Sequence, residues 1–172
     1  MVRILGVDPG LKTTGFAIVD FDWQDAESVN MTKIWSGKKS RRWKVLDYGV
    51  IDTNVEDGLS VRLKEIYDGL TELIDNYRPE KVAIESLFFC NNQKTAMLVG
   101  QARGVVLLAG EQAGLKLVEF TPRQVKQAVS GYGLAKKNQV QFMVKELYCL
   151  VEEPKPDDAA DALAVCYCAM IN

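Results

Sequence analysis

Apolar residues in this chain recur with two different periods, which separate predicted strands from predicted helices. Short β-branched and apolar runs at Arg3–Asp8, Thr14–Asp20 and Val45–Thr53 predict three strands arranged as a meander. From Leu59 to Tyr77, apolar residues recur every three or four positions, which indicates an amphipathic helix with one face toward a core.

The second half of the chain alternates short apolar runs with longer helical patterns. The predicted elements are a buried strand at Lys81–Ile84, a helix from about Gln93 to Ala113, a strand at Leu115–Glu119, and helices near Pro122–Val129, Lys137–Leu150 and Asp157–Met170. This order predicts an α/β fold, in which a mixed sheet of about five strands has helices packed on its faces.

Length and composition limit the possible chemistry. The chain has 172 residues, of which 48% are hydrophobic, so we expect one domain with a single substantial core. It contains no run of about 18 apolar residues, and it does not start with the charged and then apolar segments of a signal peptide. We therefore expect a soluble, cytoplasmic protein without membrane contact. It has no histidine, and its four cysteines form no CxxC pair, which excludes imidazole-based mechanisms and leaves zinc without its usual ligands.

The distribution of charge bears on nucleic-acid binding. A net charge of −2 argues against it, because DNA-binding domains are expected to be basic. However, Lys33–Lys44 carries six positive charges, including Arg41 and Arg42, and no acidic residue, and Thr121–Leu147 carries five basic residues against one acid. Local fields can therefore differ in sign from the total.

The segment Phe21–Lys44 fits the fold poorly, because it is polar and too long for an ordinary hairpin loop. We interpret it as an atypical insertion between the second and third strands. Its basic half also contains Trp35 and Trp43, a composition suited to contacts with DNA backbone and bases. A solvated loop explains the same composition equally well.

Four carboxylates occupy positions that the predicted fold could bring together. Asp8 and Glu85 each end a strand, and strand ends of open α/β sheets line the crevice where ligands bind. Asp158 and Asp161 lie three residues apart at a helix start, so they share one face, and small alanines around them allow close packing on the sheet. Oxygen ligands alone suit Mg²⁺ or Mn²⁺, and two such ions could activate a water for phosphodiester hydrolysis.

Structural roles alone could also explain each of these acids. Asp8 before a Pro-Gly turn could be a turn residue, and Glu85 an ordinary surface residue. Asp157 or Asp158 could cap the helix, and Asp161 could be a first-turn acid favoured by the helix dipole.

Five sequence motifs, in this order along the chain, carry a resemblance to a known family. They are Gly6-Val7-Asp8-Pro9-Gly10, Thr13-Thr14-Gly15, Ile84-Glu85-Ser86-Leu87-Phe88-Phe89, Leu98-Val99-Gly100-Gln101-Ala102-Arg103-Gly104 and Asp158-Ala159-Ala160-Asp161-Ala162-Leu163-Ala164. Together they closely resemble the RuvC family of Holliday-junction resolvases over nearly the whole chain except the insertion. The resemblance implies a ribonuclease H-like fold and a homodimer that nicks two strands of like polarity at a four-way junction. It also implies divalent metal and a branch-migration helicase partner of the RuvAB kind.

The resemblance also suggests individual roles. Asp8, Glu85, Asp158 and Asp161 match the family's catalytic carboxylates, whereas Asp157 matches none and is assigned to capping. Phe88 resembles the aromatic placed against bases at the junction centre, although core packing is the alternative for this ring.

Two further regions resemble functional parts of the family. Lys126, Lys136 and Lys137 lie in a segment similar to its DNA-facing region, although a solvated helix start would look the same. Gly100 and Gly104 belong to a small-residue stripe that either contributes to a dimer contact or packs on the protomer's own sheet.

Two other functions compete with the nuclease. An actin-like or sugar-kinase-like ATPase uses an Asp and a Gly/Thr-rich turn similar to Asp8–Gly15, but needs a second domain around its nucleotide. A module that binds junctions without cutting should lack at least one acid, and none is missing.

Overall fold

The computed structural model describes residues 1–22, 43–86 and 93–172, and its centre is a five-stranded sheet. The strands are β1 (Val2–Asp8), β2 (Thr13–Phe21), β3 (Trp43–Asp52), β4 (Lys81–Glu85) and β5 (Lys116–Phe120), in the spatial order β3-β2-β1-β4-β5. The first three form an antiparallel meander, and β4 and β5 continue the sheet parallel to β1. This is the mixed sheet that the ribonuclease H-like resemblance predicts, and each strand lies within two residues of its expected bounds.

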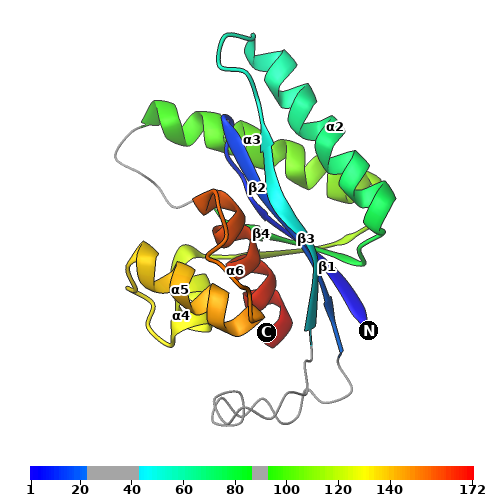
Figure 1. The fold of residues 1–172 in the computed structure, drawn as a ribbon. Helices are drawn as coiled ribbons and strands as arrows, with labels where there is room; N and C mark the ends of the chain where they lie inside the picture. The colour runs from blue at the N-terminus through cyan, green and yellow to red at the C-terminus, as the bar shows by residue number, and fades with distance from the viewer. Residues whose placement is uncertain (23–42, 87–92) are drawn as a thin grey trace.

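Helices cover both faces of this sheet (Figure 1). One face carries α2 (Leu59–Tyr77) and α3 (Gln93–Gln112), and the other carries α4 (Pro122–Ser130), α5 (Lys137–Tyr148) and α6 (Asp157–Ile171). Across the described ranges, no helix is both long and apolar enough to span a membrane.

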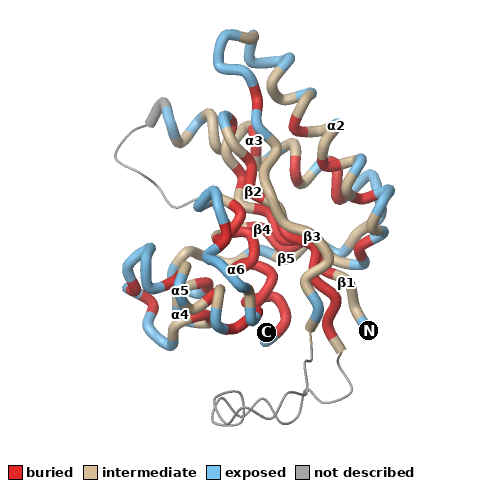
Figure 2. Tube along the Cα trace, viewed as in Figure 1, coloured by how far each residue is buried: buried red, intermediate tan, exposed pale blue. Residues whose placement is uncertain are grey.

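The alternation of residues along the strands creates two separate cores. In β1, Leu5 and Val7 join the cluster under α2 and α3, while Ile4 joins the cluster under α4, α5 and α6. The strands at the middle of the sheet are therefore buried on both sides (Figure 2). This burial explains why β1 and β4 appear in the sequence as nearly continuous apolar runs.

Helix α6 approaches the sheet closely because glycines and alanines line the contact. A Cβ added at Gly6 would lie 2.5 Å from the carbonyl oxygen of Ala162 and 2.5 Å from the Cys166 sulfur. Every residue from Ala162 to Met170 is buried. The small residues that the sequence places in this helix therefore do bring it against β1 and β2.

Strands β2 and β3 include residues at both ends of the segment from 21 to 44 that was predicted to be an insertion. Phe21 pairs with Trp43 across β2 and β3, so neither residue belongs to the connecting segment. The Trp43 indole Nε1–H donates to the carbonyl of Leu147 at 3.0 Å, and its ring packs edge-on against Tyr148. Trp43 is therefore a half-buried residue of β3 that packs against the core, and its predicted place in the insertion is wrong.

Candidate active site

The strand register places Asp8 and Glu85 side by side. β1 and β4 are parallel, and their last paired residues are Val7 and Ile84, so the next residue of each strand is an acid. Side chains alternate along a strand, so Asp8 points to the same face as Gly6, and Glu85 to the same face as Ala83. That face is the one covered by α6.

The first turns of α6 bring the other two acids to the same strand ends. Asp8 pairs with Gly15 of β2, and a Cβ added at Gly15 would overlap the main chain of Asp158. The start of α6 therefore lies directly over the pair formed by Asp8 and Gly15. Asp161 follows Asp158 by about one helical turn and shares its face.

The acids act on one another electrostatically. The pKa of Asp8 is raised to about 8, chiefly by burial and then by the negative charges of Glu85, Asp161 and Asp158 in that order. Burial also raises the pKa of Glu85 to about 7, with the charge of Asp161 as the next cause. The pKa of Asp161 is raised chiefly by burial. Like charges gathered in a partly dehydrated site favour protons or cations as counter-charges.

Lys137, the first residue of α5, supplies part of that counter-charge. Its Nζ lies 3.3 Å from Asp161 Oδ2 and 3.3 Å from Asp157 Oδ2. Desolvation lowers the pKa of Lys137, but the attraction of Asp161 and the hydrogen bonds to both acids outweigh it, and the net shift is upward. Lys126 also lowers the pKa of Glu85 by its charge, so two cations border the acids.

Asp157 does not cap α6, contrary to the prediction. The N-cap residue is Pro156, which has no side chain able to cap, and Asp157 is the first residue inside the helix. Its Oδ1 instead accepts a hydrogen bond of 2.7 Å from Gln141 Nε2. This bond, followed by those from Lys137, lowers the pKa of Asp157. Asp157 thus ties α5 to α6 beside the acids.

The four acids fit a hard divalent cation in kind. They supply carboxylate oxygens only, and the raised pKa values of Asp8, Glu85 and Asp161 indicate a local excess of negative charge that a cation would relieve. Within the described residues, no three acidic or cysteine side chains already converge in a metal-coordinating arrangement, and Asp161 is paired with Lys137. Asp8, Glu85, Asp158 and Asp161 are the residues that would hold an ion.

The remaining predicted site residues divide into two groups. Lys126 lies within α4 and is half-buried, whereas Lys136 and Lys137 stand at the start of α5 and are exposed. The main-chain N–H of Lys136 donates to Gln139 Oε1 at 2.8 Å, which helps to start α5. Phe88, Arg41 and Arg42 lie outside the described residues, so their predicted DNA contacts remain predictions.

Reasoning from sequence missed two contributors to the site. The bond from Gln141 to Asp157 joins residues on different helices, and no local pattern indicates it. The sequence did mark Gly15, since it lies in the motif Thr13-Thr14-Gly15. Its role became clear only from the packing of α6, because a larger residue there would overlap Asp158.

Comparisons with known proteins match nearly the whole chain. The family profile for "Crossover junction endodeoxyribonuclease RuvC" matches residues 4–169. The chain is 50% identical over 165 residues to the protein of that name from Halothermothrix orenii, covering 96% of this chain and 90% of that one, and 46% identical to the one from Desulforamulus reducens over 96% and 91%. Thermus thermophilus RuvC in complex with Holliday junction substrate superposes with a TM-score of 0.82 at 32% identity, covering 98% of this chain and 92% of that chain.

Proposed function

The chain belongs to the RuvC family of crossover junction endodeoxyribonucleases, and on that premise we propose that it resolves four-way (Holliday) DNA junctions by paired, symmetric nicks in homologous recombination and DNA repair. The observation that carries this proposal is the match along almost the full chain, with all four acids of the site present. Neither alternative, the ATPase domain or the junction-binding module that does not cut, has support from the proteins that this chain resembles.

We assign the catalytic role to Asp8, Glu85, Asp158 and Asp161, with Mg²⁺ as the preferred cation, Mn²⁺ as a substitute and two ions per site. Bound there, such ions would supply Lewis acidity toward the attacking water and the leaving 3′ oxygen. The water oxygen forms a bond to phosphorus as the bond to the 3′ oxygen breaks, so no side-chain nucleophile is needed. The acids come from two strand ends and one helix, which holds them in a fixed relation.

Basic residues around the acids suit the DNA backbone. Lys126 and Lys137 act electrostatically on the acid cluster, so a phosphate held at these acids would lie near both cations. We propose that they, with Lys136, Arg41 and Arg42, contact phosphates and supply salt-dependent affinity. Phe88 follows Glu85 by three residues, and we assign it to stacking on an unpaired base at the junction centre.

We propose that the protein acts as a homodimer in the cytoplasm with a branch-migration motor of the RuvAB kind. Support for the dimer comes from α3, whose buried face includes Ala102, Val106 and Ala109. Gly104 is exposed on this helix, and a Cβ added there would meet nothing within 4 Å. At Gly104 the small-residue stripe is therefore not packed on its own sheet, which leaves it available to a second copy.

The decisive test is cleavage of a synthetic four-way junction in Mg²⁺ or Mn²⁺. The wild-type protein should give nicks at symmetric positions in two strands of like polarity, whereas Asp8→Asn should bind the junction without cutting it. Asp75→Asn is the matched control, because Asp75 is an exposed acid on α2, on the opposite face of the sheet. Wild-type protein that binds junctions but cuts none with either ion would refute the nuclease assignment.

A further inference from the structure

A cavity of about 560 Å³ lies between α5 and the loop that joins α4 to α5. Its volume falls within the range of sites that bind small organic ligands. None of the four acids lines it. The lining residues come from the end of α4, the loop after it, α5 and the segment before α6, and they are Ser130, Tyr132, Ala135, Asn138, Gln139, Phe142, Met143 and Glu153.

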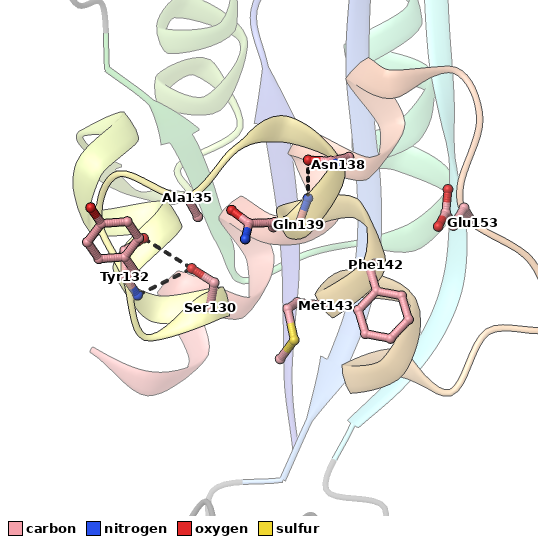
Figure 3. Close-up of a pocket in the computed structure, with 8 residues that line it drawn as sticks. All are labelled: Ser130, Tyr132, Ala135, Asn138, Gln139, Phe142, Met143 and Glu153. Carbon is pink, nitrogen blue, oxygen red and sulfur yellow. Dashed lines mark hydrogen bonds between the residues drawn. The ribbon is translucent and has the colours of Figure 1, made fainter.

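Two aromatic side chains are among the residues that line this cavity. Tyr132 and Phe142 lie on opposite sides, with Gln139 and Met143 between them (Figure 3). Both residues are largely exposed, Tyr132 by 60% and Phe142 by 50%. Exposed aromatic faces on a basic, DNA-facing segment are the usual platforms on which unpaired bases stack.

The cavity also offers hydrogen-bonding groups that the protein itself does not use. Asn138 Oδ1 accepts from the main chain of Gln139, and Gln139 Oε1 accepts from that of Lys136, so both side-chain NH₂ groups remain as donors. Across the described residues, neither these NH₂ groups nor the Glu153 carboxylate has a hydrogen-bond partner. Amide donors with a carboxylate acceptor are the groups that read the edges of bases, and a carboxylate accepts from an exocyclic amine. Glu153 would repel a phosphate.

The position of α5 connects this cavity to the acids. Lys137 of α5 contacts Asp161, and Asn138 follows it about 100° further round the helix. A helix is about 10–12 Å across with its side chains, and nucleotides of one strand in a duplex rise about 3.4 Å each. The cavity therefore lies within the length of a few nucleotides from a phosphate held at the acids.

We infer that this cavity binds one unstacked nucleobase carrying an exocyclic amino group, close to the nick, and thereby contributes to the choice of cleavage sequence. The inference rests on the proposed nuclease function. Tyr132 and Phe142 supply stacking surfaces, and Glu153 with Asn138 and Gln139 reads the edge of the base. These residues determine specificity and take no part in the hydrolysis itself.

The test compares cleavage rates over a set of junctions that carry each of the four bases at every position within about five nucleotides of the nick. Wild-type protein should prefer an amino-bearing base at one position, and Glu153→Gln should reduce that preference about tenfold. Tyr132→Ala and Phe142→Ala should lower cleavage of the preferred sequence about tenfold and flatten its profile. Val61→Ala, a residue 48% exposed on α2, is the control and should keep the wild-type profile.

The outcomes separate the two proposals. If the wild-type protein does not cut, the proposed function fails. If it cuts and all three cavity variants keep its base preference, the cavity inference alone fails. A second measurement does not depend on cutting: 2-aminopurine placed near the nick should change its fluorescence when the Asp8→Asn protein binds. That change should be lost on adding Tyr132→Ala, and its persistence would also overturn the inference.

Discussion

Replacing Asp8 with asparagine keeps the shape of the side chain but removes a carboxyl whose pKa in the folded protein is about 8. Because this pKa is raised by burial and by the neighbouring acids, the folded protein holds the Asp8 proton more tightly than the unfolded chain. The stabilisation from this proton is complete below about pH 4, which is the ordinary pKa of an aspartate in the unfolded chain. It is lost as the pH rises through 8, the pKa in the folded protein. Without added metal, wild-type stability should therefore fall between pH 4 and pH 8.

The size of this effect follows from the pKa shift. The rise from 3.8 to about 8 is about four units, and each unit corresponds to about 1.36 kcal/mol, which gives about 5 kcal/mol near pH 8. Water and dissolved cations that enter the site screen part of the repulsion, so we expect Asp8→Asn to gain about 2 kcal/mol at pH 8. For a chain of this length, that is about 4–8 °C in Tm.

The assay is thermal unfolding in a chelating buffer at pH 5, 6.5 and 8. The stability advantage of Asp8→Asn should grow with pH, while Asp75→Asn should show no such growth. Adding Mg²⁺ at pH 8 should stabilise the wild-type protein more than Asp8→Asn, because a cation replaces the missing proton as counter-charge. An Asp8→Asn protein that is no more stable than wild type at pH 8 would show that the acids do not repel one another as inferred.

Three further substitutions test other parts of the structure. Gly15→Ala should destabilise the fold by about 2–4 kcal/mol and reduce cleavage, because its methyl group would overlap the start of α6. Gly58→Ala is the control, because a methyl group there meets open space and should change neither stability nor cleavage. Thermal unfolding measures the stability, and junction cleavage measures the activity. Trp43→Phe should lower the free energy of unfolding by about 1 kcal/mol in urea titrations, since it loses the indole hydrogen bond but keeps an aromatic ring, and an unchanged value would contradict the core role. The Lys137→Met protein should bind Mn²⁺ about tenfold more tightly at pH 9, measured by calorimetry, because the substitution removes the cation paired with Asp161. Weaker binding would mean that Lys137 does not compete with the metal.

The layout of the fold could be predicted because each element carries a local signal. β1 and β4 are short apolar runs that end in acids, and α2 repeats apolar residues at the helical period. Their ends were within two residues of the prediction. The mixed sheet followed from the order of these elements, whereas the spatial order of its strands was not predicted, since periodicity alone does not specify which strands pair.

The positions of the acids at two strand ends and one helix start could be predicted, but the contacts around them could not. Asp8 and Glu85 stand at strand ends that parallel pairing must bring together, so sequence position was informative. The contacts of Asp157 depend on how α5 docks against α6, and the sequence suggested only a cap. Trp43 was assigned to the basic insertion because charge dominates that segment, while its partner Tyr148 lies more than 100 positions away.

Helix α6 makes core packing and site geometry inseparable. The missing side chains of Gly6 and Gly15 let this helix pack closely on β1 and β2, and the same close approach places Asp158 and Asp161 over the strand ends. Substitutions that move this helix should therefore alter stability and activity together. The counter-charge has a different origin, because Lys137 reaches the acids from α5 and is held by surface bonds to α6. The charge balance at the acids can therefore change without disturbing the core, which is why Lys137→Met and Gly15→Ala should separate an electrostatic effect from a packing effect.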